Sequence, residues 1–267
     1  MTTEPPVGLI AAIPEEAEHL RDVPGRIIRV GGLAFETTTL DGTPAVIVET
    51  GIGKVNAAVT ATLLCERFGC RALLFGGVAG GLDPDHHVGD VVIGTTVVQH
   101  DYGALVDGGQ VTYQPGTIPF PDRDRSHGYH VSPSAAAALA DIVRDLRLPH
   151  LPASIAGDAP RRPTVSLGRI LTGDTFVNDE GARARLHAAF AAQAVEMEGG
   201  AVAQVAERFG IPWVVVRGLS DLAGSSSHVD FRAFLPVAAA NAAAVVRAVV
   251  RHRAWGSPGG GTPSGSQ

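Results

Sequence analysis

Acidic side chains stand at two points where an apolar run of the sequence ends, and carboxyl groups at such points can carry acid–base chemistry. Glu16 follows the run Val7–Ile13 in the sequence IPEE, which also fits a helix start with proline and acids in its first turn. That structural interpretation is favoured for Glu16 taken alone. Arg217 and Asp221 end the most hydrophobic run, where charged groups are rarely buried without a partner or a task. A functional interpretation is favoured there.

Three further segments combine glycine or acid with the end of an apolar run. Gly51–Asn56 (GIGKVN) has two of the three glycines of a dinucleotide-binding pattern, and a tight strand-to-helix turn explains it better. Gly76–Gly81 (GGVAGG) lets backbone N–H groups approach a ligand closely. Val195–Gly200 (VEMEGG) places two acids around a methionine, which solvation explains less easily.

Other reactive residue types lack the spacing that chemistry requires. His86-His87 and His100-Asp101 have neither HExxH nor Cys/His spacing around them, so we expect no metal site and no cofactor. No GxSxG elbow is present, and Ser227–Asp230 (SHVD) are too close in sequence to form a catalytic triad alone.

The composition is that of a globular protein without a cationic surface. The chain has 267 residues, of which 45% are hydrophobic, 5% aromatic and 18% charged, so a disordered or fibrous protein is excluded. A net charge of -6 argues against nucleic acid and anionic membranes as partners. Lys54 is the one lysine among the 21 basic residues.

Cysteine usage and the first residues favour a reduced, cytoplasmic protein. Cys65 and Cys70 form no CxxC motif and no cluster. The segment before Pro14 is acidic and too short in apolar residues for a signal peptide. No uninterrupted apolar run approaches the ~18 residues of a membrane span.

Apolar runs alternate with helical patterns, which predicts an α/β layered fold. The expected strands are 7–13, 45–50, 72–76, 91–99 and 212–217, and the expected helices are 55–68, 134–148, 179–190, 197–209 and 230–251.

Three segments fall outside this alternation. The proline-rich segment 102–129 is long enough to be a lid or an interface element. The segment 150–162 is a shorter excursion. Residues 256–267 (GSPGGGTPSGSQ) are expected to be a flexible tail outside the fold.

Taken in order, the motifs IPEE, GIGKVNAA, GGVAGGL, VGDVV, TGDTFV, VEMEGGAVA and VVVRGLSD resemble the purine nucleoside phosphorylase and uridine phosphorylase superfamily. Within it the match is closest to the methylthioadenosine/S-adenosylhomocysteine nucleosidases. The resemblance implies a single α/β domain over residues 1–255, with a central mixed, twisted β-sheet flanked by helices on both sides. It also implies a homodimer.

The resemblance implies hydrolysis of the N-glycosidic bond of an adenine nucleoside, with Asp221 as the general acid at purine N7 and Glu16 as the base that activates water. Burial can raise the pKa of Asp221, while a helix N-terminus is expected to keep Glu16 ionised. Arg217 is expected to support a buried acid. The implied substrate-binding residues are Val78, Ala79, Gly80, Phe176, Val177, Glu196, Met197, Glu198, Ser220 and Phe231. Among them Glu198 resembles the ligand of the ribose hydroxyls, and Phe176 resembles the residue that stacks on adenine.

Departures from the family pattern affect the substrate. Val78 stands where a small hydroxyl residue is common, Ile13 replaces a methionine and Pro14 replaces an acid. The segment 102–129 covers the region that shapes the 5′ pocket, so the 5′ substituent stays open.

Three other functions remain as alternatives. A futalosine or aminofutalosine hydrolase would share the acid, the base and the ribose ligand. A phosphate-dependent phosphorylase is less favoured, because IPEE stands where a phosphate-binding arginine pattern is expected and a carboxylate repels phosphate. A non-catalytic nucleoside-binding protein would need neither Glu16 nor Asp221.

Overall fold

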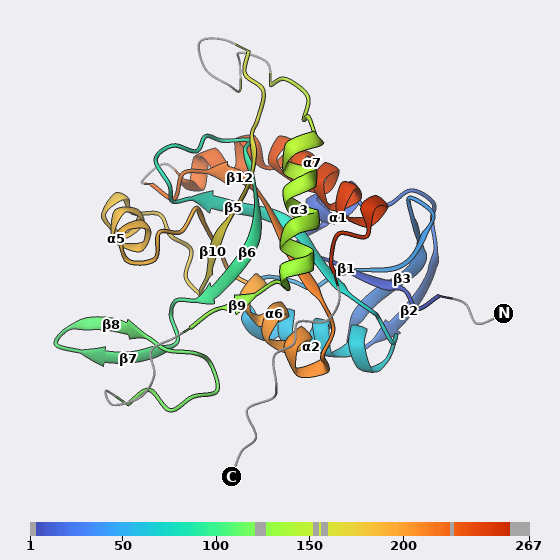
Figure 1. Ribbon diagram of the computed structural model, residues 1–267, viewed down its shortest axis with the longest axis horizontal. Helices are drawn as coiled ribbons and strands as arrows, with labels where there is room; N and C mark the ends of the chain where they lie inside the picture. Colours follow the sequence, from blue (N-terminus) through green and yellow to red (C-terminus); the bar gives the residue numbers. More distant parts are fainter. Residues whose placement is uncertain (1–3, 121–126, 152–154, 156–159, 225–226, 257–267) are drawn as a thin grey trace.

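The computed structural model describes residues 4–120, 127–151, 155, 160–224 and 227–256 (Figure 1). Single strands and helices alternate from residue 129 onward, whereas successive strands follow one another over 26–49 and 73–130. The strands are β1 (Val7–Ala11), β2 (Arg26–Val30), β3 (Leu33–Leu40), β4 (Thr43–Glu49), β5 (Leu73–Gly81), β6 (Val91–Gln99), β7 (Gly103–Val106), β8 (Gly109–Thr112), β9 (Tyr129–His130), β10 (Val165–Thr172), β11 (Ala194–Glu196) and β12 (Trp213–Asp221). The helices are α1 (Pro14–Glu18), α2 (Lys54–Glu66), α3 (Pro133–Asp145), α5 (Glu180–Phe190), α6 (Gly199–Phe209) and α7 (Ser227–His252). Of the predicted tail, residues 257–267 lie outside the described residues.

In the described part of the chain, ten strands form one mixed sheet. Its order is β11-β10-β6-β12-β5-β1-β4-β3-β2, with β9 paired to β6. Strand β11 also pairs with β5, so β5, β12, β6, β10 and β11 close into a ring while β1 to β4 extend from it as an open sheet. Strand β12 is parallel to β5 and antiparallel to β6. The predicted central mixed sheet is confirmed.

Helices cover both faces of this sheet, and the strands divide their side chains between them. Leu74 and Phe75, neighbours on β5, belong to two different hydrophobic clusters, as the two-residue period of a strand requires. The cluster with Leu74 includes buried residues of α3 and α7, and the cluster with Phe75 includes those of α2 and α6. Helices therefore cover both faces of the sheet, as predicted, and bury its central strands, whereas β2 and β3 are only partly buried.

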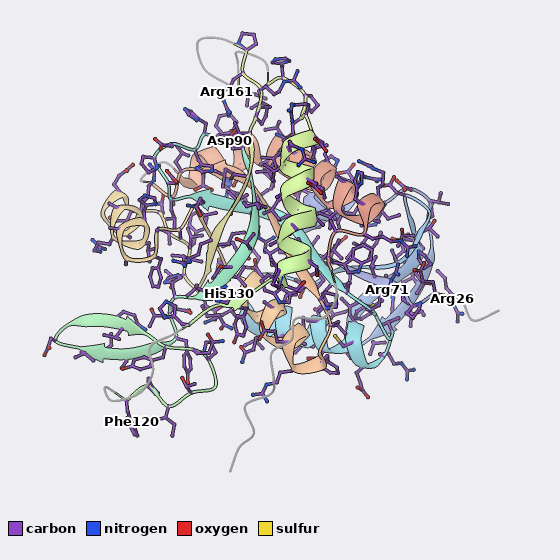
Figure 2. The ribbon with its side chains drawn as sticks, viewed as in Figure 1. Arg26, Arg71, Asp90, Phe120, His130 and Arg161 are labelled. Carbon is purple, nitrogen blue, oxygen red and sulfur yellow. The ribbon has the colours of Figure 1, made fainter. Side chains whose placement is uncertain are left out.

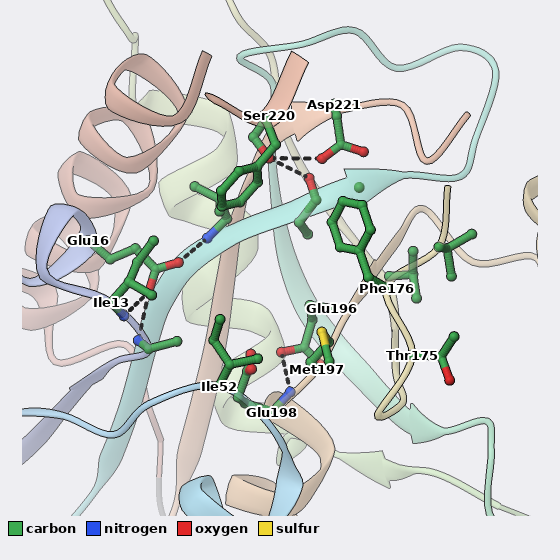
Figure 3. A pocket seen from close by; sticks show the side chains of 17 residues that line it. Ile13, Glu16, Ile52, Thr175, Phe176, Glu196, Met197, Glu198, Ser220 and Asp221 are labelled. Carbon is green, nitrogen blue, oxygen red and sulfur yellow. Dashed lines mark hydrogen bonds between the residues drawn. The ribbon is translucent and has the colours of Figure 1, made fainter. Parts of the chain in front are cut away.

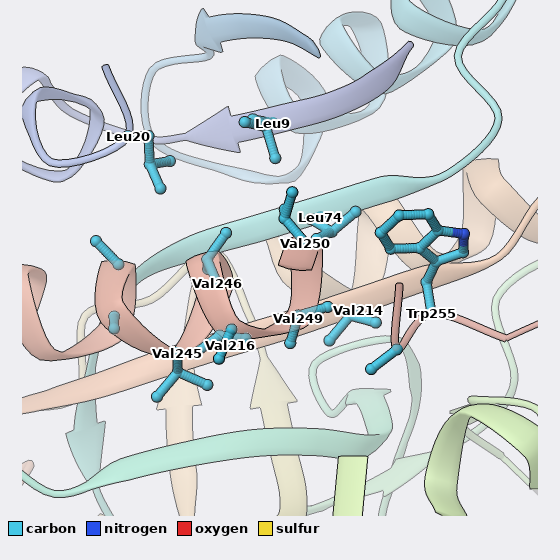
Figure 4. Packing of buried hydrophobic residues seen from close by; sticks show 14 of the residues in the cluster. Leu9, Leu20, Leu74, Val214, Val216, Val245, Val246, Val249, Val250 and Trp255 are labelled. Atoms are coloured by element: carbon cyan, nitrogen blue, oxygen red, sulfur yellow. The ribbon is translucent and has the colours of Figure 1, made fainter. Parts of the chain in front are cut away.

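Helix α7 supplies the largest apolar face. Its segment Phe231–His252 is long and apolar enough to cross a membrane by length and composition, although polar residues such as Arg247 interrupt it. Within that segment 61% of the most apolar window is buried inside the protein. Val246 and Val250 pack against Leu74 and Val214 of the sheet (Figure 4). The apolar character of α7 is thus accounted for by core packing.

The structure extends two predicted strands and adds others. Strand β5 continues through its glycines to Gly81, and β12 continues to Asp221. The two strands stay paired along this extension, where Arg217 lies opposite Gly77. Strands β2 and β3 lie at the sheet edge and are only partly buried, so their residues form no apolar run. Strand β10 was also missed, since it is buried only over its last three residues. The apolar runs marked the buried centre of the sheet and not its rim.

The segments 102–129 and 150–162 are both tied to the sheet where they are described. The first contains the hairpin β7–β8 and ends in β9. In the second, Arg161 donates to Asp90 Oδ1 at 2.6 Å, and Thr164 N donates to the same oxygen at 2.8 Å (Figure 2). Asp90 is buried, so this ion pair fixes the return of the chain into β10.

Gly218 should not tolerate a side chain. A Cβ there would lie 2.1 Å from the carbonyl oxygen of Ala238, where α7 crosses β12. We expect Gly218→Ala to destabilise the protein by about 3 kcal/mol, because backbone atoms would have to move. Chemical denaturation measures this change. Gly109→Ala is the control, since the Cβ of this β8 residue would meet only the carbonyl oxygen of Val106 on β7, at 3.7 Å. Equal stabilities for the two variants would contradict the packing of α7 on β12.

Candidate active site

A cavity of about 220 Å³ opens where strands β1, β5, β11 and β12 end (Figure 3). Parallel strands bring their carboxyl ends to one edge of a sheet, which is where α/β folds bind ligands. Every predicted catalytic and substrate-binding residue lines the cavity, and Arg217 lies behind its wall. The lining residues are Ala12, Ile13, Glu16, Ile52, Val78, Ala79, Gly80, Thr175, Phe176, Val177, Val195, Glu196, Met197, Glu198, Ser220, Asp221 and Phe231.

Glu16 reaches the cavity from the first turn of α1, and it is 5% exposed. Its Oε2 accepts hydrogen bonds from Ala12 N at 2.7 Å and Ile13 N at 3.3 Å, and its Oε1 accepts from Val78 N at 2.9 Å. The helix start and the site are therefore built by the same carboxylate. The structural and the functional interpretations of IPEE both apply.

The environment of Glu16 differs from the expected one. Burial raises the pKa of Glu16, and the charge of Arg217 and the three backbone N–H groups oppose this shift without cancelling it. The expectation for Glu16 considered only the helix N-terminus and left out desolvation, which shifts the pKa in the opposite direction. A carboxylate with a raised pKa is a stronger proton acceptor, which suits a general base.

Arg217 pairs with Glu196 in a fully buried ion pair. Its Nε donates to Glu196 Oε2 at 3.1 Å, and its Nη2 donates to the same oxygen. Glu196 also accepts from Gly199 N at 2.7 Å and from the Thr172 hydroxyl. Oε2 thus receives the arginine and backbone donors and Oε1 receives the Thr172 hydroxyl, so Glu196 is committed mainly to contacts inside the protein.

The remaining guanidinium nitrogen of Arg217 faces the region between the cavity and β5. Among the described residues, this buried Nη1 has no hydrogen-bond partner. A Cβ on Gly77 would lie 2.3 Å from Nη1 and 2.6 Å from Glu16 Oε1. Glycine at position 77 thus allows the arginine and the carboxylate to approach the same stretch of β5.

Glu198, two residues after Glu196, has a different environment. It accepts one hydrogen bond from Gly53 N at 2.9 Å, and its Oε2 lies 3.7 Å from Arg217 Nη2. Burial and the neighbouring charge of Glu196 raise the pKa of Glu198 to about 7, against the opposing effects of Arg217 and the Gly53 N–H. Glu198 therefore retains acceptor capacity toward a ligand.

Asp221 ends β12 at an irregularity of the ladder. The register with β5 shifts between Leu219 and Asp221, and such a bulge re-aims a side chain. Asp221 is 2% exposed, with Ala223 N donating to its Oδ1 at 2.8 Å and the Ser220 hydroxyl donating to its Oδ2 at 3.0 Å. Figure 3 shows Asp221 and Glu16 on different sides of the cavity. Two buried carboxyl groups thus face one volume.

Aromatic rings form the more open part of the wall. Phe176 is 49% exposed, and its ring meets that of Phe231 edge to face at 6.4 Å. Met197 lies between the two acids of the VEME segment. An exposed aromatic face beside an apolar sulfur side chain suits a flat heterocycle and a sugar.

Sequence reasoning missed part of this wall and its supports. Ile52 and Thr175 line the cavity, although the turn beginning at Gly51 was interpreted as purely structural. The turn itself is confirmed, since Gly51 and Gly53 have φ of 80° and 100°. Its N–H group at Gly53 binds Glu198, a contact across 145 residues that no local pattern could indicate. Among the described residues, no group of three or more metal-ligating side chains comes together.

Comparison with known proteins agrees with this geometry. Residues 6–251 match the phosphorylase superfamily. A 5′-methylthioadenosine/S-adenosylhomocysteine nucleosidase of Mycobacterium bovis is 46% identical over 242 residues, covering 90% of this chain and 94% of that protein. One of Anoxybacillus flavithermus is 37% identical, covering 91% and 97%.

The solved structures of similar fold include two kinds of enzyme. The nucleosidase of Helicobacter pylori bound to butyl-thio-DADMe-Immucillin-A has a TM-score of 0.77 and 28% identity, covering 93% of this chain and 99% of that one. The futalosine hydrolase of the same organism has a TM-score of 0.76 and 29% identity, covering 92% and 97%. On the extent and identity of these matches, the chain belongs to the phosphorylase superfamily and, within it, to the 5′-methylthioadenosine/S-adenosylhomocysteine nucleosidases.

Proposed function

We propose that this protein hydrolyses the N-glycosidic bond of an adenine nucleoside of the methylthioadenosine or S-adenosylhomocysteine type, releasing adenine and the ribose-containing product. The observation that carries the proposal is the placement of two buried carboxyl groups, Glu16 and Asp221, on different sides of one cavity. Binding a neutral nucleoside would require neither, whereas breaking its glycosidic bond requires an acid and a base.

Asp221 is assigned the general acid. As the bond from C1′ to the purine nitrogen breaks, its electron pair moves into the base, and a proton from Asp221 to N7 lets adenine leave neutral. The bonds from Ser220 and Ala223 hold the carboxyl group in one orientation toward the cavity. Positioning of this kind lowers the reorganisation that proton transfer needs.

Glu16 is assigned the general base, with Arg217 as its support. A water molecule in the cavity beside Glu16 would give its proton to the carboxylate as its oxygen bonds to C1′, while the charge of Arg217 acts on the carboxylate from behind the cavity wall. The position of Glu16 in the cavity lining, with Arg217 close behind it at Gly77, supports this location. The raised pKa of Glu16 supports the role of a proton acceptor.

The remaining contacts are assigned to the two halves of the nucleoside. Glu198 would accept hydrogen bonds from the ribose hydroxyls and stabilise the positive charge that develops on the sugar. Met197 would pack on the sugar. Phe176 and Phe231 would stack around adenine, while the backbone of Val177 reads its edge. Val78, Ala79 and Gly80 form the wall near Asp221, and Glu196 supports the site through Arg217.

Futalosine or aminofutalosine hydrolysis is the second candidate, because a futalosine hydrolase is among the similar structures. It would use the same acid, base and ribose ligand on another nucleoside. A phosphorylase is less favoured, since the Glu16 carboxylate would repel phosphate and Arg217 is already paired with Glu196.

We also propose a cytoplasmic homodimer that acts in methionine salvage, with the folded domain ending at residue 255. Ile52, Val55 and Leu105 expose 56%, 75% and 81% of their surface, and Ile52 lines the cavity, so we assign these residues to the dimer surface. Sedimentation measures the state directly, and a monomer would contradict the dimer. Cys65 and Cys70 are unpaired, as in a reducing compartment.

The nucleosidase proposal predicts adenine release without phosphate. Methylthioadenosine, S-adenosylhomocysteine, adenosine, inosine and aminofutalosine are incubated with the protein, with and without phosphate, and free base is measured. We expect fastest cleavage of a 5′-thio adenine nucleoside and no effect of phosphate. Preferred cleavage of aminofutalosine would support the second candidate. A strict need for phosphate would reject hydrolysis.

Loss of either carboxyl group should abolish most turnover. We expect Asp221→Asn and Glu16→Gln to lower kcat by roughly 10²- to 10⁴-fold, because each removes one proton transfer. Single-turnover kinetics measure this loss, and thermal denaturation checks the fold. Glu15→Gln is the matched control, because Glu15 is its exposed neighbour on α1. Near-normal activity of Asp221→Asn would refute its assignment as the acid.

Glu198 should make stability depend on pH. Its pKa of about 7, against 4.5 as the ordinary value, means that the folded protein keeps a proton that the unfolded chain releases. This contribution to stability is complete below about pH 4.5 and is lost as pH rises through about 7. Glu198→Gln cannot ionise, so its melting temperature relative to wild type should rise from pH 5 to pH 8. A constant difference across this range would contradict the raised pKa.

A further inference from the structure

The one lysine of the sequence lies outside the cavity and is not used by the proposed chemistry. Lys54 begins α2, directly after Gly53, and its side chain is 18% exposed. Its Nζ lies 2.6 Å from Asp101 Oδ1 and 3.7 Å from Asp174 Oδ2. A lysine held between two carboxylates, in a chain that otherwise uses arginine, calls for an explanation.

Backbone hydrogen bonds make these three residues a closed arrangement. Lys54 N donates to Asp174 Oδ1 at 2.9 Å, and Asp174 N donates to Asp101 Oδ2 at 2.9 Å. Asp174 therefore contacts the backbone and the side chain of Lys54 with its two oxygens, while Asp101 binds the Lys54 side chain with one oxygen and the backbone of Asp174 with the other. The arrangement, which we name the Lys54 clamp, joins the start of α2 to the chain following β6 and to the chain following β10.

Two of the joined segments carry the nucleoside-binding residues. Thr175 and Phe176 follow Asp174 directly, and both line the cavity. Gly53 precedes Lys54, and its N–H group is the hydrogen-bond donor to Glu198 Oε1. Ile52, one residue earlier, lines the cavity near Glu198 (Figure 3). The Lys54 clamp thus sets the separation between the aromatic residue proposed for the base and the carboxylate proposed for the ribose.

We infer that Lys54 is a positioning residue for nucleoside binding, acting through Asp101 and Asp174 on Phe176 and on the Gly53 contact to Glu198. This inference rests on the proposed nucleosidase function. Glu16 and Asp221 are held by their own contacts on α1 and β12, so the clamp acts on binding more than on proton transfer.

The charges of the clamp explain why its loss would move these segments. Burial raises the pKa of Asp101, but the hydrogen bond from Lys54, the N–H of Asp174 and the lysine charge lower it further, so the carboxylate is ionised. Without the lysine charge, Asp101 would face Asp174 across the distance that Lys54 now bridges. Repulsion between these like charges would then move Asp174, and with it the segment that leads to Phe176, away from Asp101, and the ion pair of Asp174 with the start of α2 would be lost.

Lys54→Met tests the inference, because it keeps the length of the side chain and removes its charge. We expect KM for the best nucleoside to rise roughly tenfold and kcat to change less than about threefold, as for a lost binding interaction. The dissociation constant of adenine, measured by calorimetry, should rise as well. Lys54→Arg keeps the charge and should restore most of the affinity.

Two further variants separate the clamp from general effects. Arg144→Met removes exposed ion pairs with Asp141 and Asp145 on α3, so it controls for loss of a surface cation. Asp101→Asn keeps the lysine and, if Lys54→Met fails to fold, tests the same clamp by the same rise in KM. In the double variant, the rise in KM should be smaller than the two single-variant rises combined, because both substitutions break the same ion pair.

Unchanged KM and adenine affinity in folded Lys54→Met or Asp101→Asn would overturn the inference. A loss in kcat alone, or failure of Lys54→Arg to restore binding, would overturn it as well. Failure of the nucleosidase function has another signature. Wild-type protein would then release no base from any nucleoside, while calorimetry with adenine would still report whether the clamp affects binding.

Discussion

The ion pair between Arg217 and Glu196 is the interaction on which the site depends. Arg217 comes from β12 and Glu196 from β11, two strands that each pair with β5, and the guanidinium carbon lies 3.9 Å from the centre of the Phe75 ring. Burying two charges costs several kcal/mol per ion, which is recovered only when their hydrogen bonds are satisfied. Thr172, Gly199 and Arg217 satisfy Glu196, and removal of either partner leaves an uncompensated charge. The pair thereby links β12 to β11 within the closed ring.

Close approach of these groups requires β5 to carry glycine at selected positions. At Gly77 a side chain would collide with Arg217 and Glu16, and at Gly80 it would lie 3.0 Å from Asp221 Oδ1. Strand interiors lose stability with glycine, because the backbone has more freedom to lose on folding. Here that loss lets three charged groups, one from α1 and two from β12, converge on one strand. The glycines at positions 77 and 80 of β5 are therefore required for packing of the charged side chains, independently of any contact with a ligand.

Much of the fold and site followed from local sequence patterns, and what did not follow depends on contacts between distant residues. Leu9, Leu74 and Val214 stand in apolar runs, so the buried strands were predictable. Strands β2 and β3 pair at an exposed edge, where polar residues face solvent and leave no apolar signal.

The site divides in the same way. Glu16, Glu198 and Asp221 could be found because their motifs resemble those of a family in the same order. The bond from Gly53 to Glu198 and the ion pair of Lys54 with Asp101 join residues far apart in the sequence. The helix and strand propensities of residues and the spacing within motifs carry no information on contacts between distant parts of the chain. The raised pKa of Glu16 was missed for a related reason, since desolvation depends on what packs over the carboxylate.

The two acids of the VEME segment show why the site needs both. Glu196 uses its oxygens on Arg217, Thr172 and backbone N–H groups, and so spends its acceptor capacity on the structure. That arrangement fixes the arginine and puts a negative charge beside Glu198, which contributes to raising the pKa of Glu198 to about 7. Glu198, with a single backbone donor at Gly53, is left as the acceptor that faces the cavity. Had one acid performed both tasks, binding a hydroxyl would compete with holding Arg217. Two carboxyl groups separated by one methionine remove that competition, because one holds the arginine and the other is available to the ligand.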